Sequence, residues 1–79
     1  MDPEVNRMKT LSQEESERLA KRIDRDPRGF DRYEAHGLSE DDQGWYVCVA
    51  DTWGTRQNPG GRELAVRAWR EWDEIVAPA

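Results

Sequence analysis

The sequence predicts a small α+β domain in which an N-terminal and a C-terminal helix pack on an antiparallel sheet of two or three strands. Three observations support this class: a capping pattern before a charged segment, a strand-like run of aromatic and β-branched residues, and an apolar stripe with helical spacing near the end. The expected order is α-β-β-(β)-α. With 79 residues, the chain has room for one such domain.

The first helix is predicted over about residues 12–25. Ser12 and Glu15 have the spacing of a capping box, in which a hydroxyl and a carboxylate satisfy free backbone N–H groups. Pro27 ends the helix, because the residue before a proline avoids the α region. Residues 1–10 are polar and are expected to form a flexible lead-in to a single domain over residues 11–79.

The clearest strand runs over residues 44–51, which are rich in aromatic and β-branched side chains. Residues 30–38 are compatible with a helical turn or a strand, and a strand from about Asp31 to Gly37 is favoured because it lies at hairpin distance. Residues 39–44 then form an acidic loop.

Alternation along the strand over residues 44–51 places one set of side chains on the helix-covered face: Trp45, Val47 and Val49. A register that pairs Ala35 with Val47 and Tyr33 with Val49 adds the apolar residues of the first strand to that face.

The second helix is predicted over about residues 59–76, with Asn58 as N-cap and Pro59 at the first helical position. Its apolar residues recur at helical spacing and should face the sheet: Leu64, Ala65, Ala68, Trp69, Trp72, Ile75 and Val76. Residues 52–57, just before this helix, form either a short third strand or a loop.

The charge balance restricts the partners. A net charge of −5 and a pI of about 4.8 argue against direct nucleic-acid binding and favour a protein partner with a basic surface. The single cysteine, Cys48, excludes an internal disulfide and a multi-cysteine zinc site. The sequence contains no long apolar run and no secretory signal, so a cytoplasmic location without membrane contact is expected.

The residues carry no recognised catalytic, metal or cofactor motif, so a non-enzymatic protein without cofactor is expected. The remote alternative is an enzyme that uses Cys48 and His36. In the predicted register, His36 lies opposite Tyr46 and Cys48 opposite Glu34, on a sheet face without an evident oxyanion donor.

Two surfaces are candidates for partner binding. The first is electrostatic and combines the acidic residues of the hairpin with those of the C-terminal segment: Glu40, Asp41, Asp42, Asp51, Glu71, Asp73 and Glu74. The second is the face of the sheet turned away from the helices, with four contact candidates: Glu34, His36, Tyr46 and Cys48.

In its small size, acidic balance, charge-rich helix–hairpin–helix plan and single free cysteine, the chain resembles the anti-CRISPR proteins that phages encode. This resemblance implies a stoichiometric inhibitor in the host cytoplasm. Such a protein mimics DNA with its acidic surface, occupies the basic groove of a CRISPR surveillance complex and blocks binding of target DNA. The alternative is an antitoxin or small adaptor that binds through the sheet face. Either protein would be a monomer or a weak homodimer.

Overall fold

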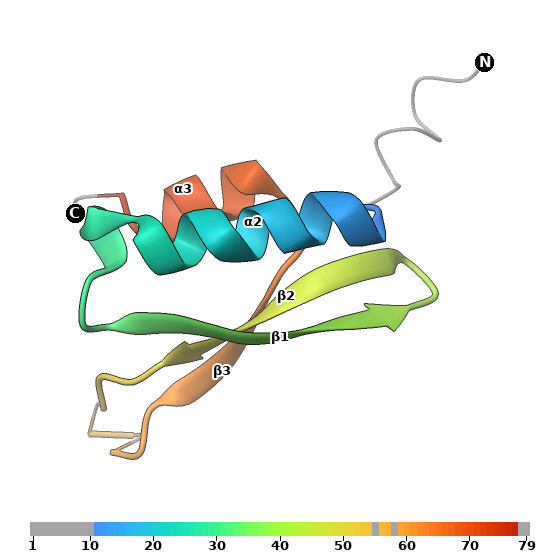
Figure 1. Ribbon diagram of the computed structural model, residues 1–79. Coiled ribbons are helices and arrows are strands. Elements are labelled where there is room, and N and C mark those ends of the chain that lie inside the picture. Colours follow the sequence, from blue (N-terminus) through green and yellow to red (C-terminus); the bar gives the residue numbers. More distant parts are fainter. Residues whose placement is uncertain (1–10, 55, 58, 78–79) are drawn as a thin grey trace.

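The protein is a three-stranded antiparallel sheet covered on one face by two helices, in the order α-β-β-β-α (Figure 1). The computed structural model describes residues 11–54, 56–57 and 59–77. Its elements are α2 (Gln13–Arg25), the short 3-10 helix η1 (Pro27–Gly29), β1 (Tyr33–Asp41), β2 (Gly44–Asp51), β3 (Arg62–Val66) and α3 (Trp69–Ile75). The predicted class of small α+β domain is confirmed. The lead-in predicted for residues 1–10 lies outside the described residues.

The capping box predicted for the first helix is present. The Ser12 hydroxyl accepts a hydrogen bond from the Glu15 amide (3.2 Å), and the Glu15 carboxylate accepts one from the Ser12 amide (2.9 Å). The bond from the Ser12 amide holds the pKa of Glu15 below its ordinary value. Leu19 and Ile23 point to the sheet, and both are buried.

The first hairpin is longer and tighter than predicted. Ser39, Glu40 and Asp41 belong to β1, so the expected acidic loop over residues 39–44 shrinks to the turn at Asp42 and Gln43. The Asp41 carboxylate accepts a hydrogen bond from the Gln43 amide at 2.9 Å, which stabilises a tight turn in place of the predicted loop.

The register of β1 on β2 differs from the prediction by two residues. Tyr33 lies opposite Asp51 and Ala35 opposite Val49, whereas Val49 and Val47 were the expected partners. Because side chains alternate with a period of two, this shift leaves every residue before the irregularity on its predicted face. A bulge between Ala35 and Gly37 then brings Leu38 opposite Val47 on the helix-covered face.

The predicted second helix over residues 59–76 is wrong in its first half. Arg62–Val66 form β3, antiparallel to β2, and α3 contains only Trp69–Ile75. Leu64 and Val66 lie two residues apart, which places them on one face of a strand but on opposite sides of a helix, and pairing also satisfies backbone groups along the free edge of β2. The third strand therefore lies after residues 52–57, and the described residues of that segment are not in a strand. The predicted N-cap, Asn58, lies outside the described residues.

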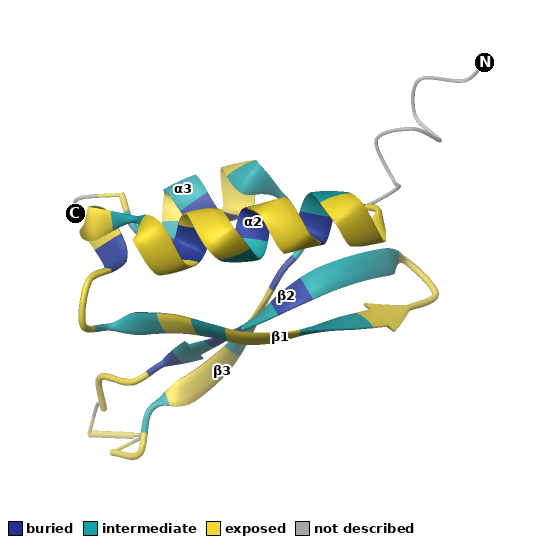
Figure 2. Ribbon diagram, viewed as in Figure 1, coloured by how far each residue is buried: buried dark blue, intermediate teal, exposed yellow. Residues whose placement is uncertain are grey.

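The core lies between the helices and the inner face of the sheet (Figure 2). Its members that are at most 2% exposed come from both helices and from two of the strands: Leu19, Ile23, Val47, Val49, Val66 and Trp72. Trp72 from α3 meets Tyr33 edge-on, with ring centroids 5.4 Å apart. The prediction that both helices pack on the face of Val47 and Val49 is confirmed. Trp72 is the largest fully buried side chain in this core.

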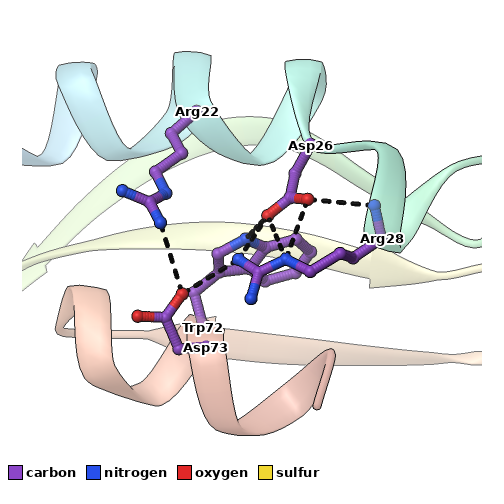
Figure 3. A network of polar contacts seen from close by, with 5 residues as sticks. All are labelled: Arg22, Asp26, Arg28, Trp72 and Asp73. Carbon is purple, nitrogen blue, oxygen red and sulfur yellow. Dashed lines mark hydrogen bonds and ion pairs between the residues drawn. The ribbon is translucent and has the colours of Figure 1, made fainter. Parts of the chain in front are cut away.

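Trp72 is tied to the end of α2 by its indole N–H, which donates to the Asp26 carboxylate at 2.8 Å (Figure 3). The same carboxylate accepts hydrogen bonds from the Arg28 amide and guanidinium. The guanidinium of Arg28 is the main cause that holds the pKa of Asp26 far below its ordinary value, against the opposing effect of burial. This contact joins the two helices at one end of the domain.

Candidate functional site: the open face of the sheet

The face of the sheet turned away from α2 and α3 is not covered by any described helix or strand (Figure 1). Its middle strand, β2, contributes the side chains that alternate with the buried Val47 and Val49. These are Tyr46, Cys48 and Ala50, and all three are half-buried. We call this surface the open face.

The neighbouring strands add small and charged side chains to the open face. On β3, Ala65 lies opposite Cys48 and Glu63 opposite Ala50. On β1, Gly37 lies opposite Cys48 and Glu34 opposite Ala50. The strand positions around Cys48 in the middle of the open face therefore carry only small groups.

An ion-pair contact spans the open face from one outer strand to the other. His36 Nε2 of β1 lies 3.0 Å from Glu63 Oε1 of β3. The bulge in β1 places His36 for this contact, because it shifts the strand by one residue directly at this position. The contact is a salt bridge only when His36 is protonated.

A second cross-sheet cluster lies at the hairpin end of the open face. The Arg67 guanidinium stacks over the Tyr46 ring, 4.4 Å from its centroid, and forms a two-pronged ion pair with Asp41. Hydrogen bonds from Arg67 hold the pKa of Asp41 below its ordinary value. This arrangement fixes the Tyr46 ring as a rigid border of the open face.

The charge of the open face is negative. Arg67 and Asp41 neutralise each other, whereas the Glu34 carboxylate is exposed and has no ion pair among the described residues. Glu63 is 70% exposed, and among the described residues its ion-pair partner is His36 alone. The open face thus carries two exposed carboxylates beside its small apolar centre, and neither has an arginine or lysine partner among the described residues.

The four sheet-face candidates from the sequence lie on or beside this surface. Glu34, Tyr46 and Cys48 keep the predicted side of the sheet, and His36 reaches the same side through the bulge. The predicted pairs of His36 with Tyr46 and of Cys48 with Glu34 are wrong, because Cys48 faces Gly37 and Tyr46 faces Ser39. The ion-pair partner of His36 is Glu63. Among the described residues, no hydrogen bond or ion pair joins His36 to Cys48.

The acidic candidates are dispersed rather than gathered. Asp51 is buried and held by the guanidinium groups of Arg32 and Arg62, so its carboxylate is not available to a partner. Hydrogen bonds from Arg32 are the main cause that keeps the pKa of Asp51 below its ordinary value. A charged residue at the end of an aromatic-rich strand has no sequence signal that separates this internal role from an exposed one.

Most of the remaining acidic candidates have partners within the chain. Asp41 binds Arg67, as described above. On α3, Glu71 accepts a hydrogen bond from the Arg67 amide (2.6 Å), and Glu74 lies 3.8 Å from Arg70. Asp73 contacts Arg22 and Arg28 (Figure 3). Glu40 and Asp42 are exposed and form no ion pair among the described residues, so they alone match the expected free acidic surface.

Glu63, Ala65 and Arg67 of the open face were not predicted as site residues. They were missed because residues 59–76 were assigned to a helix, which separated them from the sheet. The signal that identifies them is the alternation of Leu64 and Val66 with charged neighbours after two glycines.

Among the described residues, no group of three or more potential ligands is arranged to hold a metal ion. None of the described helices is long and apolar enough to cross a membrane. Comparisons with protein-family models, with curated proteins and with solved structures found no match for this chain.

Proposed function

We propose that the protein is a non-enzymatic binding module that takes a protein partner on its open face. The observation that carries this proposal is an uncovered sheet face whose small centre, Cys48, Ala50 and Ala65, is bordered by ordered charged and aromatic side chains. Apolar surface with a polar rim is typical of contact surfaces between proteins.

The charged side chains at the border of the open face indicate the chemistry of the partner. Glu34 and Glu63 supply negative charge without a matching arginine or lysine, so a partner segment with basic side chains is favoured over an acidic one. This agrees with the overall charge of −5. The partner is expected to place aliphatic or aromatic groups on the small centre and basic groups near the two carboxylates.

The size of the open face argues against a stable homodimer formed through this surface alone. Three strands about 4.8 Å apart and about five paired residues of 3.3 Å each give a patch of roughly 14 Å by 17 Å. This is well below the about 800 Å² per partner of a standard interface. The contact with a partner is therefore short-lived or extends beyond the open face.

The proposal is tested with Ala65→Lys, which adds bulk and positive charge to the centre of the open face at an exposed position. Ala77→Lys is the matched control, because Ala77 is also exposed but lies beyond α3. Tagged wild-type protein and both variants are used to capture partners from the organism that encodes the chain. We expect one partner to be retained by wild type and Ala77→Lys and lost by Ala65→Lys; equal capture by all three contradicts the proposal.

A second candidate function is the DNA-mimicking inhibitor of the anti-CRISPR type. Its support is the pair of exposed carboxylates at the hairpin tip, Glu40 and Asp42, together with the net charge of −5. Capture through these charges alone should weaken steeply as salt rises, whereas capture through the open face, which also uses an apolar centre, should weaken less. A double variant, Glu40→Lys with Asp42→Lys, should abolish inhibition of a CRISPR surveillance complex if this candidate is right and leave Ala65-dependent capture intact if it is not.

A further inference from the structure

Three arginines gather at the C-terminal end of α2, on the helix side of the molecule and away from the open face. Arg22, Arg25 and Arg28, together with Asp26 and Pro27, line a surface pocket of about 340 Å³. Helical spacing brings Arg22 and Arg25 to one side of α2, and η1 turns Arg28 back toward them.

The acidic groups beside this pocket do not neutralise it. The side chain of Asp26 is 7% exposed, and its oxygens are occupied by Arg28 and the Trp72 indole. One carboxylate oxygen of Asp73, Oδ1, contacts two guanidinium groups: it lies 3.4 Å from Arg22 Nη2 and 2.9 Å from Arg28 Nη2. Arg25 forms no ion pair among the described residues. Three positive charges therefore face two negative ones, in a protein whose overall charge is −5.

Asp73 indicates what kind of ligand the pocket prefers. Its carboxylate is about half exposed, and it extends from α3 to contact Arg22 of α2 and Arg28 of η1 (Figure 3). A single carboxylate oxygen shared by two guanidiniums leaves several of their N–H donors unused. A tetrahedral dianion has more acceptor oxygens and more charge, so it can engage donors that Asp73 leaves free.

We propose that Arg22, Arg25 and Arg28 form a binding site for a phosphate monoester, and that Asp73 competes with this ligand for two of the three arginines. The monoester is favoured over a nucleic-acid backbone because the positive charge is confined to one small cluster and the rest of the acidic chain repels a polyanion. The carbonyl end of α2 also disfavours anions, so the arginines must supply the binding energy and a modest affinity is expected.

The test is an NMR titration of the full chain that follows the side-chain N–H signals of the arginines at a fixed ionic strength of about 0.15 M. Inorganic phosphate and phenyl phosphate are the probes, and a single-stranded oligonucleotide supplies diesters. We expect saturable shifts of Arg22, Arg25 and Arg28 with the dianions. A stronger response to phenyl phosphate identifies an esterified ligand, and an equal response identifies the phosphate group itself.

Three variants make the test specific. Arg25→Gln should weaken phosphate binding about fivefold or more, whereas Arg18→Gln, which removes an exposed arginine of α2 outside the pocket, should leave it unchanged. Asp73→Asn should strengthen binding, a change that a merely structural role would not produce. The absence of saturable shifts, equal losses in the two arginine variants, no gain with Asp73→Asn, or tighter binding of the oligonucleotide at the same arginines would overturn the proposal.

Discussion

Replacement of Trp72 by alanine is predicted to remove a large part of the stability of the domain. The side chain is fully buried, meets Tyr33 edge-on and donates a hydrogen bond to Asp26, so its loss leaves a large cavity between α3 and the sheet. Trp→Ala changes in cores cost about 3–5 kcal/mol. A domain of 79 residues has a total stability of about 4–12 kcal/mol at 0.05–0.15 kcal/mol per residue.

At about 4–8 °C per kcal/mol for a domain of this size, Trp72→Ala should lower the melting temperature by at least about 12 °C or prevent folding. The matched control is Trp53→Ala, because Trp53 is 56% exposed and its described ring contact is with Arg32. That change should cost about 1 kcal/mol or less. Thermal melts followed by circular dichroism compare the two variants, and equal losses would refute the assignment of Trp72 as the centre of the core.

Three further predictions concern the polar and backbone features that hold the sheet and helices together. The pKa of Asp26 is lowered in the folded protein, so the stability that its carboxylate contributes is complete above the pKa of the unfolded chain and is lost as the pH falls. The melting temperature should therefore decrease below about pH 4, and it should decrease less steeply in Asp26→Asn. Asp51→Ala should cost about 2 kcal/mol in urea unfolding because it frees two arginines, and a loss no greater than that of Asp42→Ala would contradict the buried role of Asp51. Gly61→Ala should cost more than about 1 kcal/mol, because Gly61 has a φ of +88° and a Cβ there would lie 2.3 Å from the Asp51 carbonyl oxygen. In the control Gly60→Ala, the added Cβ meets no atom within 4 Å, so this change should be nearly neutral.

The elements that the sequence predicts well are those whose signals are local. The capping box at Ser12 and Glu15 needs only residues three apart, and the alternation of β2 needs only its own side chains. Both therefore appear where they were predicted. The covered face of the sheet follows from the same alternation, and it survives a register error of two residues because the period is two.

The errors concern features that depend on distant residues. The predicted helix relied on the helical spacing of Leu64, Ala65 and Ala68, whereas Leu64 and Val66, two residues apart, have the spacing of a strand. The strand is selected by pairing with the free edge of β2, a distant partner that local spacing does not identify. The bulge at His36 likewise depends on how β1 meets both β2 and α2. The predicted acidic surface failed at Asp51 for a related reason, since its two arginine partners come from positions 32 and 62.

The exposure of Cys48 tests the open face most directly, because Cys48 is the only cysteine and lies in the central strand of the sheet. A bulky maleimide is added to the folded protein, the labelling rate is compared with that of the urea-unfolded chain, and the labelled protein is melted. We predict labelling of the native state without unfolding and a melting temperature within a few degrees of the unlabelled protein. Labelling that occurs only when the chain unfolds, or a labelled protein that loses its fold, would show that this side of the sheet is covered.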